Sequence, residues 1–421
     1  MIPLGYHLPG NDHIGFLQSQ QPGKFFECIY DHSEAHLLTI APTGAGKGRS
    51  NVIPTCLTYP GSLIVLDPKG EAARVTSKAR RRFGKVYIID PFKLVTKHPA
   101  KFNPMDIVLT EHAPEQQGIM LAQALQDGYG GFKSDPFWDN KANDILSAAM
   151  IHQLTTKKSF AAFRKGLVEG DVDYNIAAML DSKTVKNQLA EELYSTYLSI
   201  CSEKTRPSVL STAQQHLTLL GEPCVLDSLE GPSSFSVYDL LKGKPMTIYL
   251  VIPPNKLKAF VQLVRLWVVS FMYLLTERKV RPKIPTLFII DECGNLGKLD
   301  SLVTSVTLLR SYGLRLWMMF QDLGQLKTVY DKEWTTMVNN CAVIQAFGFR
   351  NQMMAKEIAE VIGGISHPDL LRMKQDMAVM ATPGKPGRLI KRLDYLNDEI
   401  FNDSGFAENR MYKNSRAAAP W

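Results

Sequence analysis

The hydrophobic residues in the first part of this chain form short continuous runs that alternate with segments of helical period. Apolar runs occupy 36–42, 62–68 and 85–91, and helical patterns lie between them at 49–59, where Pro54 is expected to interrupt the helix, and at 71–83. Uniformly apolar strands between helices are typical of a parallel sheet that is covered on both faces. The pattern therefore predicts an α/β fold from about residue 36 onward.

The pattern changes between residues 111 and 235. This segment carries helical periodicity and almost no strand signal, and we expect it to form an all-α domain inserted into the α/β domain. The predicted α/β domain thus has two parts, residues 1–110 and 236–400. The polar end, 401–421, is expected to be a flexible C-terminal tail.

Strand-like runs return after the predicted insertion. Further strands are expected at 246–253, 286–292, 314–320 and 339–349, helices at 256–277 and 299–311, and a late strand pair at 377–382 and 387–396. The late pair is predicted to close the edge of the sheet as a hairpin.

Composition and charge narrow the class of protein without assigning a function. The chain of 421 residues is 45% hydrophobic and 21% charged, with a formal net charge of +7, as in soluble globular proteins. Its six cysteines lie far apart, which favours free thiols in a reducing compartment. No signal peptide is evident, and the longest apolar stretch, 266–275, is much shorter than the roughly 20 residues that cross a bilayer. We expect a cytoplasmic protein.

Residues 41–48, APTGAGKG, resemble the Gly-x-x-x-x-Gly-Lys-Ser/Thr phosphate-binding loop, with two departures. Ala41 replaces the first glycine, and Gly48 replaces the hydroxyl residue that ligates Mg²⁺. The motif nevertheless leaves a predicted strand and enters a predicted helix, so that backbone N–H groups and the lysine can converge on phosphate oxygens. The residues expected to bind the nucleotide here are Pro42, Thr43, Gly44, Ala45, Gly46, Lys47, Gly48 and Arg49.

Asp291 and Glu292 follow a run of apolar residues in LFIIDECGNLG, 287–297. An aspartate at the tip of a buried strand can hold Mg²⁺ through water, and the adjacent glutamate can orient or deprotonate an attacking water. A strand that simply ends in solvated acids is the alternative. Because the acidic pair accompanies the loop around Lys47, we predict ATP and Mg²⁺ as cofactors, with Asp291 at the metal and Glu292 as the base.

Gln321 and Arg310 are two further candidates for a hydrolysis site. Gln321 ends the predicted strand 314–320, where its carboxamide can sense or polarise a γ-phosphate, or merely cap the strand. Arg310 ends the helix that follows Asp291 and Glu292. This position is poor for reaching its own nucleotide and suited to reaching that of a neighbouring subunit, unless Arg310 is an ordinary surface arginine.

Several motifs occur in the order seen in one known family. They are APTGAGKG, SLIVLDPKGE (62–71), KFNPMD (101–106), FWDNKA (137–142), IIDECGNLGKLDSL (289–302) and RSYGLRLWMMFQDLGQL (310–326). With them, roughly residues 30–400 resemble the coupling proteins of type IV secretion and conjugation, the TraG-like branch of the RecA-type hexameric ATPases. The segments around LDPKGE and the acid–arginine–glutamine series are the specific parts.

The resemblance implies a RecA-like P-loop NTPase domain with a predominantly parallel sheet and an inserted all-α domain. It also implies that glycine after the P-loop lysine is acceptable. Transferred residue by residue, Lys47 contacts phosphate, Asp291 the metal and Glu292 the water, Gln321 is the sensor, and Arg310 is the finger that acts in the next subunit. Residues near the P-loop that complete the site are Asp67, Lys69 and Glu71.

The resemblance further implies a motor that assembles as a homohexameric ring and recruits DNA with a bound relaxase, or secreted proteins, to a secretion channel and its ATPases. Typical members begin with transmembrane helices, and this sequence shows none. Either the sequence is a trimmed form, or the protein is a soluble member that reaches the inner membrane peripherally through an anchoring partner.

DNA is expected as a partner from the resemblance, and the basic run 77–85, with five basic residues in nine and no acid, could contact its phosphates. A lone run of this kind is more often a solvated helix face. Three functions remain open: a DNA-driving coupling ATPase, a nucleotide-gated adaptor for protein substrates, and a DNA motor in defence or DNA maintenance.

Overall fold

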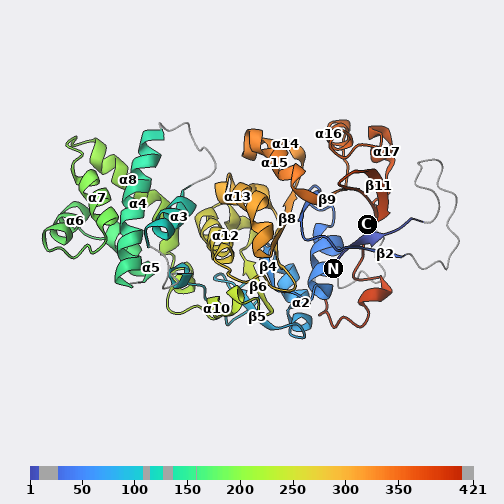
Figure 1. The fold of residues 1–421 in the computed structure, drawn as a ribbon, viewed down its shortest axis with the longest axis horizontal. Helices are drawn as coiled ribbons and strands as arrows, with labels where there is room; N and C mark the ends of the chain where they lie inside the picture. Colours follow the sequence, from blue (N-terminus) through green and yellow to red (C-terminus); the bar gives the residue numbers. More distant parts are fainter. Residues whose placement is uncertain (9–26, 108–113, 127–135, 158, 410–421) are drawn as a thin grey trace.

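The computed structural model describes residues 1–8, 27–107, 114–126, 136–157 and 159–409 (Figure 1). Its central feature is one 11-stranded sheet in the order β2-β1-β11-β10-β9-β3-β8-β7-β4-β6-β5. The block from β9 to β5 is parallel throughout, which confirms the predicted α/β architecture. Its strands are β3 (His36–Ile40), β4 (Leu63–Asp67), β5 (Lys85–Ile89), β6 (Met246–Val251), β7 (Thr286–Ile290), β8 (Leu314–Phe320) and β9 (Cys341–Ala346).

Both faces of the parallel block are buried, because successive side chains of a strand point to opposite faces. In β4, Leu63 and Val65 join one hydrophobic cluster, whereas Ile64 and Leu66 join the other. Helices cover both clusters, so the strands can be apolar along their whole length.

The helices on the two faces come from different parts of the chain. The first cluster contains η1 (Gly48–Val52), α1 (Ile53–Thr58) and α2 (Glu71–Arg80), and the other contains α12 (Val261–Thr276) and α13 (Asp300–Leu308). The helix after the P-loop continues through Pro54 but changes type there: η1 is a π-helix, and α1, which has Pro54 in its first turn, is an α-helix.

The predicted late hairpin is present as β10 (Met377–Thr382) and β11 (Lys385–Lys391), but the expectation that it closes the sheet edge is wrong. β1 (Ile2–Tyr6) pairs with β11, and β2 (Cys28–Asp31) forms the edge. Gly5, with φ +152°, allows this pairing, since a Cβ there would lie 2.6 Å from the carbonyl oxygen of Lys391. The alternating apolar residues Ile2, Leu4 and Tyr6 were the available signal for β1.

Within the described residues, the chain between β5 and β6 forms helices and no strand. These helices are η2 (Pro104–Ile107), α3 (Pro114–Leu125), α4 (Pro136–Thr156), α5 (Phe160–Val168), α6 (Val172–Asp181), α7 (Gln188–Leu198), α8 (Thr205–Leu217), η3 (Leu219–Gly221), α9 (Pro223–Leu229) and α10 (Val237–Leu241). α4 is central, because α3, α5, α7 and α8 all pack against it. Helices α4 to α8 form one end of the molecule (Figure 1). α3 also packs against α12 and so connects this helical group to the sheet.

The remaining helical elements lie in the connections between and after the strands from β6 onward. They are α11 (Pro254–Leu257), η4 (Cys293–Leu296), η5 (Leu309–Tyr312), α14 (Leu323–Tyr330), η6 (Asp331–Glu333), α15 (Trp334–Asn339), α16 (Gln352–Ile362), α17 (His367–Arg372) and η7 (Glu399–Phe401). None of the described helices combines the length and the hydropathy that a membrane crossing needs.

Part of the expected flexible tail, residues 401–421, is packed against the fold. Phe401 is fully buried, and the amide N–H of Ala407 donates to the carbonyl of Val75 in α2. Residues 410–421 lie outside the described residues. All six cysteines are free thiols, as expected, and Cys56, Cys293 and Cys341 are buried.

The basic run 77–85 is only partly exposed. Arg80 is buried at the end of α2, where it donates to Thr247 Oγ1 and the carbonyl of Gly61, both at 2.8 Å, and to the carbonyl of Tyr59. Lys78, Arg81 and Lys85 remain exposed, so Arg80 stabilises the fold and is not available to phosphates in solution.

We expect Arg80→Ala to lower the unfolding temperature much more than Arg81→Ala. Loss of the guanidinium leaves buried carbonyls without a donor, at about 1–3 kcal/mol for each group, whereas an exposed substitution changes stability by less than about 0.5 kcal/mol. Thermal unfolding followed by calorimetry measures both. Equal shifts in the two variants would contradict this role for Arg80.

Candidate nucleotide site

The P-loop connects β3 to η1 with the backbone that its glycines allow. Gly44 and Gly46 have φ values of +80° and +92°, a region that favours glycine. Ala41 needs no such freedom, because it still belongs to the sheet and its N–H donates to the carbonyl of Phe320 at 2.9 Å. The first departure from the motif is therefore compatible with the loop geometry.

A pocket at the carboxyl edge of the sheet brings together most of the residues that the sequence singles out. It is lined by Pro42, Thr43, Gly44, Gly46, Lys47, Gly48, Arg49, Asp67, Lys69, Glu71, Asp291 and Glu292, together with apolar residues. Of the other predicted site residues, Gln321 bonds to Glu292 at the pocket rim, Ala45 belongs to the loop without lining the pocket, and Arg310 lies elsewhere.

Lys47 lies at the floor of this pocket, where it is 6% exposed. Its ammonium group donates to the carbonyl of Ala41 at 2.8 Å and lies 3.7 Å from Glu292 Oε1. The P-loop cation and the predicted base therefore neutralise each other across the space between β3 and β7.

Glu292 is held in an unusual conformation. Its φ and ψ of 59° and 41° are left-handed, which for a residue other than glycine costs of order 1–3 kcal/mol and is often found at functional sites. Gln321 Nε2 donates to Glu292 Oε2 at 2.8 Å, so the predicted base and the predicted sensor are directly connected.

Asp291 lies beside Glu292 at the exit of β7. Burial raises the pKa of its carboxyl group to about 6, against the opposing charges of Lys47 and Lys69, while the charge of Glu292 raises it further. A buried carboxylate in this position is poorly solvated, which favours its pairing with a cation.

Asp67 has a structural task at the exit of β4. Its carboxylate accepts hydrogen bonds from the N–H groups of Glu71, at 3.1 Å, and Ala73, at 2.8 Å, and so holds the first turn of α2. Burial raises its pKa to about 7, partly offset by these hydrogen bonds, and the charges of Asp291 and Glu71 raise it further.

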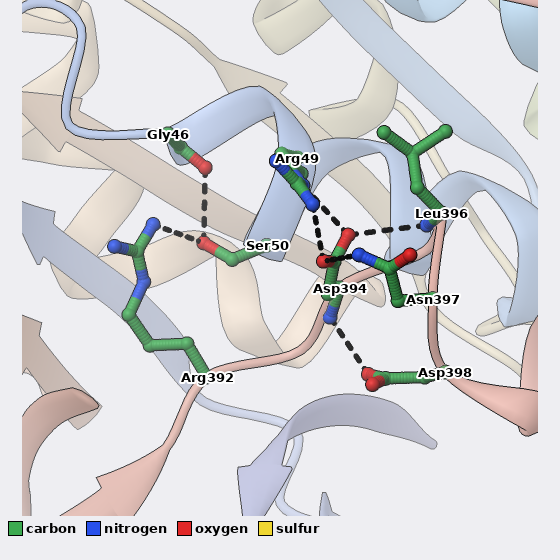
Figure 2. A network of polar contacts seen from close by, with 8 residues as sticks. All are labelled: Gly46, Arg49, Ser50, Arg392, Asp394, Leu396, Asn397 and Asp398. Carbon is green, nitrogen blue, oxygen red and sulfur yellow. Dashed lines mark hydrogen bonds and ion pairs between the residues drawn. The ribbon is translucent and has the colours of Figure 1, made fainter. Parts of the chain in front are cut away.

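Arg49 lines the pocket, but its guanidinium is paired away from it. Arg49 Nε donates to Asp394 Oδ1 at 2.6 Å, and Nη2 pairs with Oδ2 (Figure 2). Both side chains are largely buried. The charge of the Arg49 side chain is therefore already neutralised by Asp394, in the segment after β11, and is not available to bind the nucleotide as predicted.

Arg392 is a site residue that sequence reasoning missed. Its Nη2 donates to the carbonyl of Ala45 at 2.7 Å. It also donates to Ser50 Oγ at 2.8 Å, and Ser50 Oγ donates to the carbonyl of Gly46 at 3.0 Å (Figure 2). Burial and the charge of Arg49 lower the pKa of Arg392 to about 9. Arg392, in the segment after β11, thus holds the P-loop backbone in place.

Arg350 also holds the backbone of the P-loop. Its Nη2 donates to the carbonyl of Thr43 at 2.7 Å. Both arginines follow strands of the β9–β11 region, and nothing in their local sequence distinguishes them from the other arginines of the chain.

Arg310 lies at the opposite edge of the sheet. It is exposed in η5, immediately before β8, and it acts on His36, the first residue of β3: burial, Arg315 and then Arg310 lower the pKa of this imidazole to about 4. A five-residue strand spans roughly 16 Å, so Arg310 is far from the P-loop of its own chain.

The family model for type IV secretory system conjugative DNA transfer matches residues 11–369. The chain belongs to this family.

Its relatives in the family are known from several bacteria. The type IV secretion system-coupling protein VirD4 of Bartonella quintana is 24% identical over 347 residues, which are 79% of this chain and 53% of the relative. The conjugal transfer protein TraG of Escherichia coli is 26% identical over 386 residues, 85% of this chain and 60% of the relative. The chain spans about half the length of the first of these relatives.

Solved structures share the fold of this family member. The plasmid coupling protein TrwB in complex with ADP and Mg²⁺ matches with a TM-score of 0.65 and 16% identity, covering 86% of each chain. VirB4 of Thermoanaerobacter pseudethanolicus matches with a TM-score of 0.57 and 15% identity, covering 93% of this chain and 96% of VirB4. These matches confirm the RecA-like NTPase fold.

We expect Arg392→Gln to weaken ADP binding about threefold to tenfold, although Arg392 does not line the pocket. The substitution removes two hydrogen bonds that hold the P-loop, each worth about 1 kcal/mol. Titration calorimetry measures the affinity, with Lys385→Gln, an exposed change in the same hairpin, as the control. Unchanged ADP affinity in a variant with a lowered unfolding temperature would limit Arg392 to a role in stability.

Proposed function

We propose that this protein is an ATP-hydrolysing coupling motor that recruits DNA, with its bound protein, and drives it into a type IV secretion or conjugation channel. The observation that carries the proposal is the convergence of Lys47, Asp291, Glu292 and Gln321 at one edge of the sheet, in a chain of the conjugative DNA transfer family.

Each of these side chains has a part in the proposed hydrolysis. The N–H groups of the P-loop and the ammonium group of Lys47 bind phosphate oxygens. Lys47 thereby leaves its ion pair with Glu292 and pairs with the more highly charged phosphate. Glu292 is then free to accept a proton from the attacking water. Gln321, which donates a hydrogen bond to Glu292, orients the Glu292 carboxylate and senses whether a γ-phosphate is bound.

The chemistry of the donor set fits a magnesium ion that is bound mainly by the nucleotide. Asp291 offers a buried carboxylate, and no group of three or more acidic, histidine or cysteine side chains with metal-site geometry occurs within the described ranges. Mg²⁺ normally keeps waters and takes one or two protein carboxylates beside the phosphates. When bound, the ion would neutralise phosphate charge, and Asp291 would hold it.

Membership in the conjugative DNA transfer family supports the proposed partners of the motor. They are DNA, a relaxase or secreted protein substrates, the channel ATPases and an anchoring partner that holds the protein peripherally at the inner membrane. The helical group between residues 111 and 235 is proposed to be the inserted domain that selects the cargo. Its position at the far end of the molecule from β9–β11 leaves its helices accessible (Figure 1).

The active form is proposed to be a homohexameric ring in which Arg310 acts on the next subunit. Arg310 is exposed and lies at the sheet edge opposite its own P-loop, and its neighbours Leu308 and Tyr312 are 58% and 38% exposed. Exposed apolar side chains around a cation are suited to an interface between copies of the chain.

Hydrolysis of ATP with and without single- and double-stranded DNA tests the proposed function. We expect Mg²⁺-dependent turnover that DNA increases, and no turnover in Glu292→Gln, which keeps the shape of the side chain but cannot accept a proton. Turnover that DNA does not change would favour the nucleotide-gated adaptor for protein substrates.

Lys47→Ala should weaken nucleotide binding at least about tenfold, because a charge-assisted contact is lost.

Arg310→Ala is expected to retain nucleotide binding and lose turnover, and the specific activity of the unsubstituted protein should rise with its concentration. Mixing Arg310→Ala with Glu292→Gln should restore part of the activity, since a subunit with Glu292 can receive Arg310 from its neighbour. Ser311→Ala, in the same turn, serves as the control. Activity that persists in clearly monomeric protein, without rescue in the mixture, would show that Arg310 has no role across subunits.

A further inference from the structure

Gly48, the second departure from the P-loop motif, is not required by the backbone or by the available space. Its φ lies outside the left-handed region, and a Cβ added there would meet only Glu71, at 3.5 Å from Oε2 and 4.0 Å from Cδ. These are ordinary van der Waals contacts. The residue in this position could therefore carry a side chain, and the group facing it is a carboxylate.

The carboxylate of Glu71 is held in a defined orientation. Glu71 Oε1 accepts a hydrogen bond from Asn409 Nδ2 at 2.7 Å, and the same amide group donates to the hydroxyl of Tyr395 at 2.7 Å. Asn409 is only 6% exposed, so this arrangement is buried on one side. One oxygen of Glu71 is thus occupied, and the other faces Gly48 and the pocket.

The backbone of Glu71 is also held in place. It is the first residue of α2, and its N–H donates to the carboxylate of Asp67. The backbone of this helix start is therefore held against the P-loop, and the side chain has little freedom to turn away.

The negative charge of the pocket would disfavour the binding of a polyphosphate without a metal ion. The carboxylates of Glu71, Asp291 and Glu292 line the pocket, together with Asp67, whose carboxyl group already accepts two backbone hydrogen bonds. The ammonium groups of Lys47 and Lys69 oppose them, because the charge of Arg49 is paired with Asp394. A carboxylate beside a phosphate repels it unless a cation lies between them. Hard oxygen donors of this kind match Mg²⁺.

We propose that Glu71 supplies the oxygen donor toward the nucleotide-bound magnesium ion that Gly48 lacks, and that Asn409 is the positioning residue for Glu71. This inference rests on the proposed ATP-dependent function. It explains how a P-loop without a hydroxyl residue after Lys47 could still offer the metal a protein oxygen in addition to Asp291.

A side-chain exchange between positions 48 and 71 tests the proposal, with ADP affinity measured by titration calorimetry in Mg²⁺ and in EDTA. Glu71→Gln should reduce the gain in affinity that Mg²⁺ gives by about tenfold or more, because changes near a metal site commonly cost 10–100-fold in metal affinity. Binding in EDTA should not weaken, since a negative charge beside the phosphates has been removed.

The double variant Gly48→Ser with Glu71→Gln should regain much of the Mg²⁺ effect, since the serine hydroxyl restores an oxygen donor. The matched control is Gly48→Ala with Glu71→Gln, which adds the same Cβ without oxygen and should not regain it. Asn409→Ala should give an intermediate loss, because Glu71 keeps its charge but loses its orientation.

A full Mg²⁺ effect in Glu71→Gln, or equal recovery with alanine and serine at position 48, would overturn the role of Glu71. These outcomes differ from failure of the proposed function, in which the unsubstituted protein binds ADP neither in Mg²⁺ nor in EDTA. Unfolding temperatures of all variants, measured in parallel, identify any loss that comes from misfolding.

Discussion

The parallel pairing of β3, β8, β7 and β4, which are adjacent in the sheet, determines where every part of the candidate site lies. Parallel strands deliver their carboxyl ends to one edge, and the crevice beyond that edge is where such sheets bind ligands. β3 leads into the P-loop, β8 into Gln321, β7 into Asp291 and Glu292, and β4 into Asp67 and Glu71. The hydrogen-bonded register of four strands therefore brings together residues from distant parts of the chain.

The P-loop at this edge depends in turn on a buried charge network. Arg49 is neutralised by Asp394, and Arg392 donates to Ser50 (Figure 2). Arg392 also donates to the loop backbone at Ala45. Buried ion pairs contribute little net stability, but loss of one partner typically costs about 3–5 kcal/mol. The network thus makes the geometry of the phosphate site dependent on the antiparallel strands β10 and β11, which are far from it in sequence.

The two edges of the sheet have different tasks in the proposed mechanism. The carboxyl edge holds the pocket, whereas the amino edge presents Arg310 to solvent. Because a five-residue strand separates the two edges by roughly 16 Å, an arginine at one edge is far from the pocket at the other edge of the same subunit. A ring of subunits is the arrangement in which this separation becomes useful, since each amino edge can face the carboxyl edge of the next copy.

The amino-acid sequence by itself determined the parallel strands, the P-loop, the acidic pair and the helical segment between β5 and β6, because these depend on local periodicity and on short motifs. It did not reveal that β1 and β2 extend the sheet, since their strand signal is short and interrupted by Pro3 and Gly5. Nor did it show that Arg80 is buried within a basic run.

The pairing of charged side chains depends on the tertiary fold. The local motif predicts Arg49 as a phosphate ligand, whereas in the fold its guanidinium pairs with Asp394. Arg392 and Asn409 have no local sequence signal for their contacts with the P-loop and Glu71. The physical reason is that the environment of a charged side chain is set by segments that meet through long-range packing. A local pattern specifies the element that carries the charge, whereas the fold specifies its partner.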